Sequence, residues 1–368
     1  MQMDLIQLGW HPFFEACFDE HKQNGLVPGR IARENRNNYL ILTADGDLLG
    51  EVSGKFRHNA SRFGDFPAVG DWVALSPRFD EGRGTIQAVL PRRTKFSRKA
   101  VLSGGMPETG GQLEEQVMAA NIDTAFLVTG LDNEFNPRRL ERYVTIAWDS
   151  GAAPVVILNK IDLIDDPDEY VRTVEEIAVG VPVLTVSALN KTGLNSFADH
   201  FKPGQTAVFL GSSGTGKSTI INGLLGDERQ LTREVREYDS RGRHTTTSRE
   251  LIVIPDSGIV IDTPGLREIA AFDDSDGLSK TFDDIECLAQ ECRFNDCTHN
   301  TEPGCAVRKA IEEGRLSPGR LENYRKMQKE AAYLALRRDQ RARIKETEKW
   351  KKITKMIRVR TKIDPKLK

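Results

Sequence analysis

One octapeptide of the 368-residue chain reads Gly211-Ser212-Ser213-Gly214-Thr215-Gly216-Lys217-Ser218 and matches G-x-x-x-x-G-K-[S/T] at every fixed position. The apolar run 207–210 precedes it, and the run 219–225 that follows is typical of a helix. A strand, a glycine-rich turn and a helix in this order form a loop whose backbone N–H groups face a phosphate. In such a loop Lys217 contacts the β- and γ-phosphates, and the Ser218 hydroxyl holds Mg²⁺. The octapeptide therefore predicts a bound nucleoside triphosphate.

Strand-like and helix-like segments alternate on both sides of this loop. The predicted strands cover 122–128, 153–158, 181–186, 207–210, 250–254 and 258–261. The predicted helices cover 137–148, 168–179, 196–201 and 217–225. This alternation predicts a multidomain α/β protein with a parallel, doubly wound sheet, in which ligands bind at the carboxyl ends of the strands.

A second motif, Asn159-Lys160-Ile161-Asp162, directly follows the predicted strand 153–158. A carboxylate there can accept hydrogen bonds from both N1–H and the amino group of guanine, a charge-assisted pair that adenine does not offer. Asp162 is therefore expected to select guanine, with Asn159 bracing the pocket and the Lys160 stem covering the base. A chance turn after a strand is the alternative for so short a pattern.

Two further motifs also stand at strand ends. Ser187-Ala188 follows 181–186, where a backbone N–H can meet guanine O6, although the dipeptide alone carries little information. Asp262-Thr263-Pro264-Gly265 follows 258–261. There Asp262 is expected to hold Mg²⁺ through water and the Gly265 N–H to contact the γ-phosphate. Four motifs that agree with one another predict a single GTP site with Mg²⁺.

The order of these motifs along the chain is unusual. The guanine motif and Ser-Ala come first, and the phosphate loop and Asp-Thr-Pro-Gly follow, whereas Ras-type GTPases begin with the phosphate loop. The sequence therefore resembles a circularly permuted GTPase, and a domain whose termini lie close together tolerates such a permutation. The segment after Gly265 then leads directly to the C-terminal region, so a nucleotide-driven movement could pass to that region.

Hydrolysis is expected to be slow without a partner. Leu266 follows Gly265, where Ras-like enzymes carry a glutamine that orients water. The polar segment 241–248 contains Thr245, Thr246 and Thr247, one of which could complete the Mg²⁺ shell, or the segment could be an ordinary loop. His244 is the candidate for positioning water, with a solvated loop histidine as the alternative. The predicted catalytic residues are thus His244 and Lys217.

The N-terminal third differs from the rest. Residues 1–28 have apolar positions at helical spacing, and 29–98 contain about five short strand-like runs, which suit an OB-type β-barrel. Residues 101–120 read as a linker entering a short helix that carries Leu113, Val117 and Met118. Basic and aromatic side chains could bind RNA, or could form a solvated rim. They are Arg57, His58, Arg62, Phe63, Arg92, Arg93, Lys95, Phe96, Arg98 and Lys99.

Four residues near the C-terminus predict a metal site. Cys292, Cys297, His299 and Cys305 supply three thiolates and an imidazole within fourteen residues, which suits one closed, structural zinc ion. Cys287 is nearby as a substitute ligand, and buried or free thiols are the alternative. Only five cysteines, three of them clustered, argue against a disulfide framework.

Charge is distributed unevenly. Residues 306–368 hold 21 Lys/Arg and 8 Asp/Glu, a net of +13, so the preceding residues carry −15 of the total of −2. A basic tail on an acidic body favours a phosphate-rich partner, although a solvated face is the simpler reading. From 318 a helical pattern places Tyr324, Met327, Ala331, Leu334 and Ala335 on one apolar face. No apolar run reaches the ~18 residues of a membrane helix and no signal pattern opens the chain, so a cytoplasmic monomer without a membrane partner is expected.

Barrel, permuted motifs and Cys/Cys/His/Cys module, in this order, resemble the RsgA (YjeQ) family of GTPases that depend on the small ribosomal subunit. The resemblance implies an arm and OB-fold RNA-binding domain (1–100), a permuted GTPase domain (101–280), and a helical zinc-binding domain with a basic tail (281–368). It implies GTP and GDP as ligands and the 30S subunit with its 16S rRNA as partner, the subunit stimulating hydrolysis during its late maturation. Guanine contacts fall on Asn159, Lys160, Ile161 and Asp162, phosphate contacts on Gly211 to Thr219, and zinc on Cys292, Cys297, His299 and Cys305.

Two other functions stay open on the sequence. One is a permuted GTPase of large-subunit assembly, against which the N-terminal barrel and the C-terminal zinc motif argue. The other is a nucleotide-sensing RNA-binding protein whose hydrolysis is incidental, which Leu266 keeps in consideration.

Overall fold

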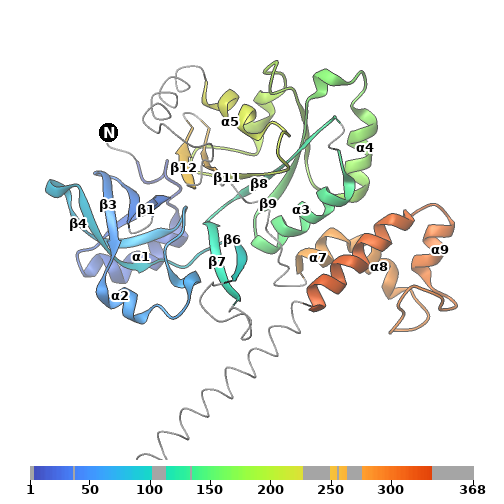
Figure 1. Ribbon diagram of the computed structural model, residues 1–368, viewed down its shortest axis with the longest axis horizontal. Coiled ribbons are helices and arrows are strands. Elements are labelled where there is room, and N and C mark those ends of the chain that lie inside the picture. Colours follow the sequence, from blue (N-terminus) through green and yellow to red (C-terminus); the bar gives the residue numbers. More distant parts are fainter. Residues whose placement is uncertain are drawn as a thin grey trace, which may run out of the picture.

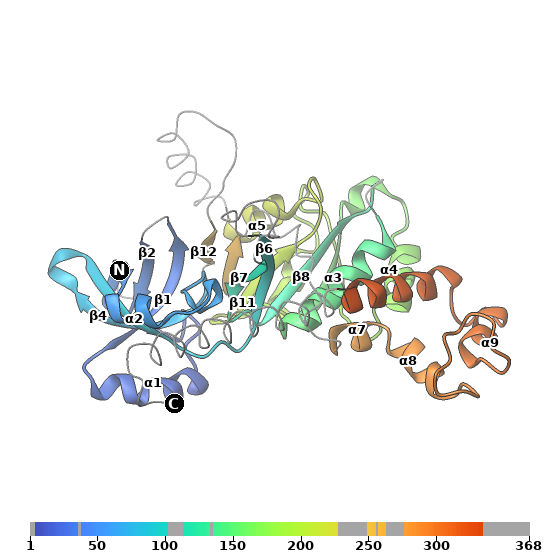
Figure 2. The ribbon, with the colours of Figure 1, turned by 60° about the horizontal axis from the view of Figure 1, so that its bottom comes forward.

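The computed structural model describes residues 4–35, 38–101, 113–132, 135–226, 249–254, 257–262 and 276–333. Three bodies follow one another across the molecule: a small barrel, a central sheet flanked by helices, and a helical C-terminal module (Figure 1). Helix α1 (Pro12–Gln23) lies against the barrel (Figure 2). The centroid of its Phe14 ring lies 5.9 Å from that of Trp72, with the two rings tilted by 44°. The helical arm predicted for the N-terminus is therefore confirmed.

The barrel closes on itself. Its strands are β1 (Val27–Glu34), β2 (Tyr39–Thr43), β3 (Gly46–Val52), β4 (Trp72–Arg78) and β5 (Arg83–Val89). They pair in the order β1-β2-β3-β5-β4, and β4 returns to pair with β1. β3 and β5 are parallel, and the other pairs are antiparallel. Alternate strand residues fill the interior, among them Ile31, Ile41, Leu48, Val73 and Ile86. The predicted OB-type barrel is confirmed, with short helix α2 (Gly54–Asn59) between β3 and β4.

A hairpin leads from the barrel to the central domain. Strand β6 (Lys95–Val101) pairs antiparallel with β7 (Leu113–Ala120), so the short helix predicted for 113–118 is wrong. Val117 packs with Ala68, whereas Met118 joins the larger core on the other side. Val117 and Met118 are therefore buried on opposite faces of one strand that is covered on both sides. In the sequence, such a run of consecutive apolar residues cannot be distinguished from a short buried helix. The predicted boundary at 100 falls within this hairpin.

The central sheet carries the predicted parallel strands. They are β8 (Thr124–Gly130), β9 (Ala153–Asn159), β10 (Val183–Val186), β11 (Thr206–Leu210) and β13 (Ile259–Asp262). The order is β10-β9-β8-β11-β13, and β12 (Glu250–Val253) adds antiparallel to β13. β12 also pairs with β1 at Arg33 and Glu250, so barrel and central sheet form one continuous ladder. The sheet is therefore mixed at this edge, not wholly parallel as predicted.

Helices cover both faces of the central sheet. α3 (Pro137–Ser150) and α4 (Asp168–Ile177) pack on the face that contains Leu127. α5 (Lys217–Leu225) and η5 (Leu194–Asp199) pack on the face that contains Phe126. The helix predicted at 196–201 is instead the 3₁₀ segment η5. This segment buries Phe197 against the sheet. Short connecting segments such as this one often form a 3₁₀ helix instead of an α-helix.

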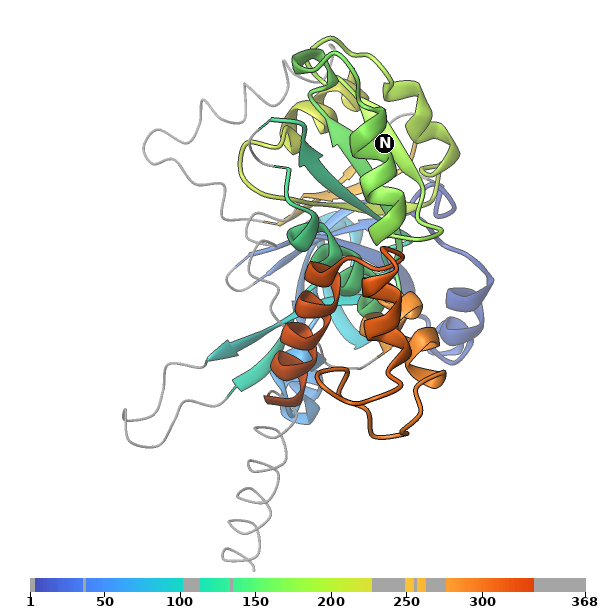
Figure 3. The same cartoon turned by 90° about the vertical axis from the view of Figure 1, so that its right-hand side faces the viewer.

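The C-terminal module is helical. It contains α7 (Asp276–Thr281), α8 (Asp283–Gln290), α9 (Ala306–Glu312) and a helix over 318–333, here called the C-terminal helix. Tyr324 and Met327 are buried in its core as predicted, whereas Leu334, Ala335 and the rest of the tail lie outside the described residues. The module packs beside α3 and α4 (Figure 3). Across the described parts of the chain, no helix is both long and apolar enough to span a membrane.

Candidate functional site

The phosphate loop lies between β11, which is entirely buried, and the first turn of α5. Gly211 and Gly216 have φ angles of +156° and +94°. A Cβ at Gly211 would lie 2.3 Å from the Val128 carbonyl oxygen, and one at Gly216 would lie 2.2 Å from the Asn159 Nδ2. Backbone conformation and lack of space thus both require glycine at these positions. The loop geometry explains the motif spacing.

Side-chain hydrogen bonds to backbone carbonyls fix the curved conformation of the loop. The Lys217 Nζ donates hydrogen bonds to the carbonyl oxygens of Gly211 at 2.8 Å and Ser212 at 2.5 Å. The buried Thr215 hydroxyl donates to the Ser212 carbonyl at 3.0 Å. Ser213, Gly214, Ser218 and Thr219 are exposed along the rim and at the start of α5. The ammonium therefore lies across the loop, at the helix N-terminus that favours an anion.

Asn159 joins three of the predicted motifs. Its side chain is only 2 % exposed, its Nδ2 donates to the Thr215 carbonyl at 2.8 Å, and its Oδ1 accepts from the Ala188 N–H at 3.0 Å. One amide at the end of β9 thus binds both the phosphate loop and the Ser-Ala turn after β10. The Ala188 N–H accordingly has an acceptor within the chain.

Asp162 lies at the same edge of the sheet. It follows Lys160, which adopts a φ of +70°, and belongs to the short turn η4 (Ile161–Leu163). The exposed Asp162 carboxylate accepts a hydrogen bond from the Ser187 hydroxyl, which itself accepts from the Asn190 N–H at 3.2 Å. The Lys160 ammonium forms an ion pair with Asp132, at the end of β8, a residue that sequence reasoning missed. The phosphate loop and the side chains predicted to contact the base therefore converge where parallel strands end.

A second missed residue is Arg139. It lies in the first turn of α3, which Asn136 caps by accepting the Arg139 N–H at 3.1 Å. The Arg139 guanidinium donates a hydrogen bond to the Ser212 hydroxyl in the phosphate loop. The available signal was its position in the first turn of the helix that follows β8, the strand that neighbours β11. Sequence reasoning counted it only as part of a helix.

The predicted Mg²⁺ ligands come from neighbouring elements. Ser218 lies in the first turn of α5, and Asp262 is the last residue of β13, which pairs in parallel with β11. A hydroxyl and a carboxylate oxygen are the hard ligands that Mg²⁺ prefers. Gly265, Leu266, His244 and the threonines 245–247 lie outside the described residues.

The predicted metal ligands form one cluster. The ligand atoms of Cys292, Cys297, His299 and Cys305 all lie within 4.8 Å of one another. The His299 Nδ1 lies 3.6 Å from the Cys292 Sγ and 3.5 Å from the Cys305 Sγ, and the two sulfurs are 3.9 Å apart. A zinc tetrahedron with ordinary Zn–S and Zn–N bonds has edges of about 3.8 Å between sulfurs and about 3.5 Å from sulfur to nitrogen. The donor set therefore fits zinc, and the exposed Cys287 is not part of it.

Other residues fix the conformation of the loop that carries the predicted metal ligands. The Glu302 carboxylate accepts from the N–H groups of Thr298, Asn300 and Thr301, and hydrogen bonding, led by the Thr298 hydroxyl, lowers the pKa of Glu302 to about 2. Arg325 on the C-terminal helix donates to the carbonyls of Thr298 at 3.1 Å and His299 at 2.7 Å. These contacts orient the ligands from outside the cluster.

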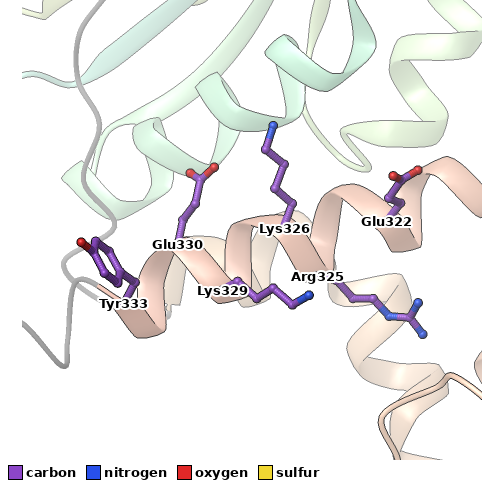
Figure 4. A pocket seen from close by; sticks show the side chains of 6 residues that line it. All are labelled: Glu322, Arg325, Lys326, Lys329, Glu330 and Tyr333. Atoms are coloured by element: carbon purple, nitrogen blue, oxygen red, sulfur yellow. The ribbon is translucent and has the colours of Figure 1, made fainter.

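The C-terminal helix also contacts α3. Glu330 forms an ion pair with Arg142 of α3, and Figure 4 shows Glu330 pointing toward a neighbouring helix while Arg325 points the other way. The residues drawn there line an open hollow of about 600 Å³, but none of them belongs to a nucleotide motif or to the metal cluster. All six lie on the C-terminal helix, so this hollow is a feature of the surface of that helix.

The guanine motif and the phosphate loop meet in space although their order in the chain is reversed, and this arrangement defines a circularly permuted P-loop GTPase. The RsgA GTPase family model matches residues 89–272. The chain is 44% identical to the small ribosomal subunit biogenesis GTPase RsgA of Opitutus terrae, over 98% of this chain and 99% of that protein. RsgA 2 of Lactiplantibacillus plantarum is also 44% identical, over 91% of this chain and 92% of the relative. The chain belongs to the RsgA GTPase family and is a GTP hydrolase.

Two solved structures resemble the fold. YjeQ from Thermotoga maritima has a TM-score of 0.60 and 26% identity, with 82% of this chain and 97% of that chain covered. YloQ, described as a circularly permuted GTPase, has a TM-score of 0.58 and 26% identity, with 83% and 94% covered. The resemblance to the RsgA family predicted from the motifs is therefore confirmed.

Proposed function

We propose that this chain binds the 30S ribosomal subunit through 16S rRNA and acts in its late maturation, hydrolysing GTP slowly alone and faster with the subunit. The observation that carries the proposal is the junction at Asn159, which joins guanine motif, Ser-Ala turn and phosphate loop in one site. Support for the partner comes from relatives that are named small ribosomal subunit biogenesis GTPases. The division into units 1–100, 101–280 and 281–368 is part of this proposal.

In the proposed complex, Asp162 accepts from N1–H and the amino group of guanine, with Asn159, Ile161 and the Ser187-Ala188 turn shaping the pocket. The Lys160 stem covers the base. Backbone N–H groups of residues 211–219, together with Lys217 and the Gly265 N–H, hold the phosphates. Ser218 and Asp262 would hold Mg²⁺, which would supply positive charge beside the β- and γ-phosphates.

Slow basal hydrolysis follows from Leu266, because a leucine cannot orient the attacking water. We infer that His244 positions this water once the subunit orders the site, and that one of Thr245, Thr246 and Thr247 senses the γ-phosphate. Single-turnover hydrolysis by His244→Ala tests the assignment. A variant as fast as the wild type, with and without subunit, removes His244 from the mechanism.

The Cys/Cys/His/Cys cluster is proposed to hold one structural zinc ion. Four protein ligands leave no open position for water or substrate, so the ion would supply folding energy and no catalytic step. Elemental analysis of protein purified without chelator is expected to find one zinc per chain. Absence of zinc would overturn the assignment.

One surface of the barrel and the charge of the C-terminal sequence support an RNA partner. The barrel exposes Arg57, His58, Arg62 and Phe63, and the sequence from 306 onward has a net charge of +13. If these groups neutralise phosphates, the logarithm of the binding constant for the subunit falls linearly with the logarithm of salt concentration, with a slope of roughly −0.7 to −0.9 per phosphate contact. A salt-independent affinity would contradict phosphate contacts.

Hydrolysis measured with purified 30S subunits, with 50S subunits and without ribosomes separates the candidate functions. Stimulation by 30S alone supports this proposal, and stimulation by 50S alone overturns it in favour of large-subunit assembly. Absence of stimulation together with RNA binding would favour a nucleotide-sensing RNA-binding protein. Because the proposed partner is a ribosomal subunit, we infer that the protein is cytoplasmic. We also infer that it is a monomer, which sedimentation of the free protein checks.

A further inference from the structure

A cavity of about 280 Å³ lies between the barrel and the β6–β7 hairpin. Residues from the ends of β1, β2 and β3, from α2, from η1 (Phe63–Asp65) and from β7 line it. The lining side chains that matter below are Glu34, Tyr39, Arg57, Phe63, Phe66 and Gln116. None of them belongs to the nucleotide or metal motifs, so the GTPase site does not account for this cavity.

One side of the cavity is aromatic. Phe63 is 54 % exposed, and its ring centroid lies 6.4 Å from that of Phe66. Tyr39 is buried beneath, and burial raises the pKa of Tyr39 to about 12, so the phenol stays protonated. An exposed phenylalanine at the mouth of a cavity offers a face on which a planar ring can stack.

Polar and cationic groups complete the cavity. The Glu34 carboxylate and the Gln116 amide lie in its lining and can exchange hydrogen bonds with a heterocycle. Arg57 also lines it, and Lys55 and His58 are exposed on the same short helix α2. An aromatic face beside clustered cations is the chemistry that binds single-stranded nucleic acid, because bases stack while cations attract the backbone.

Glu34 connects this cavity with the GTPase domain. Its carboxylate accepts from the Arg249 guanidinium at 3.3 Å, and the neighbouring Arg33 forms an ion pair with Glu250, the first residue of β12. In the sequence, Arg249 directly follows the predicted switch segment 241–248. β12 pairs in turn with β13, which ends at Asp262. A cavity residue therefore contacts the residue that enters the strand next to the predicted Mg²⁺ ligand.

We propose that the cavity receives one unpaired RNA base stacked on Phe63, and that a base bonded to Glu34 loosens the Glu34–Arg249 ion pair. The second step rests on the proposed function and deepens it, because it gives RNA binding a route to β12, which pairs with β13, the strand that ends at Asp262. A base amino group competes with the guanidinium for the same carboxylate, so occupancy weakens the contact that holds Arg249 to the barrel.

Binding of a single-stranded oligoribonucleotide to the full chain tests the cavity. Phe63→Ala is expected to weaken affinity by roughly five- to 100-fold, since stacking on one side chain is lost. An abasic strand of equal length should bind wild type and Phe63→Ala alike, and Phe63→Trp should restore affinity for the strand with bases. Phe79→Ala is the matched control, because Phe79 is 41 % exposed on the barrel but does not line the cavity.

Two results would overturn the cavity as an RNA site. One is a Phe63→Ala variant that binds the oligoribonucleotide as tightly as wild type, or that loses the abasic strand equally. The other is displacement of the strand by free nucleosides at comparable affinity, which would assign the cavity to a small molecule.

The ratio of subunit-stimulated to basal GTP hydrolysis tests the coupling. At saturating subunit, Phe63→Ala and Glu34→Gln are expected to lower this ratio severalfold, whereas Phe79→Ala keeps it. Loss of oligoribonucleotide binding with an unchanged ratio would refute the coupling. If wild-type protein is not stimulated by the subunit, the proposed function fails, while the oligoribonucleotide experiment still decides the cavity.

Discussion

Arg320 of the C-terminal helix binds Glu141 of α3 at 2.9 Å, with side chains 5 % and 0 % exposed. Arg320 also binds Asp284 at 2.8 Å and lies over the Phe282 ring. The pair joins the C-terminal module, which contains the candidate metal cluster, to the helix whose Arg139 contacts the phosphate loop. α3 therefore contacts both the phosphate loop and the C-terminal helix, whose Arg325 donates a hydrogen bond to the His299 carbonyl.

Removing one member of this buried pair should be strongly destabilising. Arg320→Met leaves the Glu141 carboxylate without its closest cation, so unfolding free energy is expected to fall by about 3 kcal/mol, as for other broken buried pairs. Urea unfolding measures the change. Arg308→Ala, which removes a more exposed pair with Glu312, should change stability by less than about 1 kcal/mol. Equal effects of the two substitutions would contradict a special role for the buried pair.

Arg139 is expected to position the phosphate loop. Arg139→Ala removes the donor to the Ser212 hydroxyl, and we expect GTP affinity to fall roughly tenfold, because hydrogen bonds from charged groups are the stronger ones. Arg139→Lys should restore part of the affinity. Arg172→Ala, an exposed arginine of α4, is the control. Equilibrium binding of a fluorescent guanine nucleotide measures all three, and wild-type affinity in Arg139→Ala would contradict the prediction.

The Asn159 amide is expected to contribute strongly to nucleotide affinity. Asn159→Ala leaves the Thr215 carbonyl and the Ala188 N–H without their partner, and two unsatisfied buried groups should lower GTP affinity by roughly 10- to 100-fold. Asn190→Ala changes an exposed amide in the same turn and should have an effect below about twofold. Equilibrium binding of a GTP analogue that is not hydrolysed compares the two variants, and equal affinities would show that the Asn159 junction does not shape the site.

Base selection should depend on the charge of Asp162. Asp162→Asn replaces an acceptor by a donor where the guanine amino group would bind, so GTP affinity is expected to fall about 100-fold. Xanthosine triphosphate, which carries a carbonyl in place of that amino group, should bind the variant better than GTP does. Competition binding with both nucleotides measures this exchange, and unchanged preference for GTP would refute the role of Asp162.

Two nearby cysteines, Cys287 and Cys297, are expected to differ in their effect on zinc binding. Cys297→Ser removes a predicted ligand, so zinc content should fall well below one per chain and the module should unfold at lower temperature. Cys287→Ser should keep one zinc, because Cys287 is exposed and lies outside the cluster. Metal analysis and thermal unfolding report both variants. Full zinc content in Cys297→Ser would exclude that thiol from the site.

Local patterns made most of the fold predictable. Glycine spacing, an apolar run and a helix-like run located the phosphate loop, because Gly211 and Gly216 occupy positions that only glycine fits. Cys292, Cys297, His299 and Cys305 could be grouped because close spacing in sequence keeps them close in space. The strand 113–120 was misread as a helix, since Val117 and Met118 are buried on opposite faces by segments distant in sequence.

The sequence by itself determined which motifs the chain carries, their permuted order and the strand–loop–helix units that hold them. Only the tertiary structure decided which side chains touch. The Asn159 amide reaches Thr215, 56 residues away, and Arg139 reaches Ser212, 73 residues away. β12 pairs with the barrel strand β1 and brings Arg249 to Glu34, 215 residues apart in the chain. Such partners are set by which strands and helices lie side by side in the fold, and no local propensity or spacing specifies those neighbours.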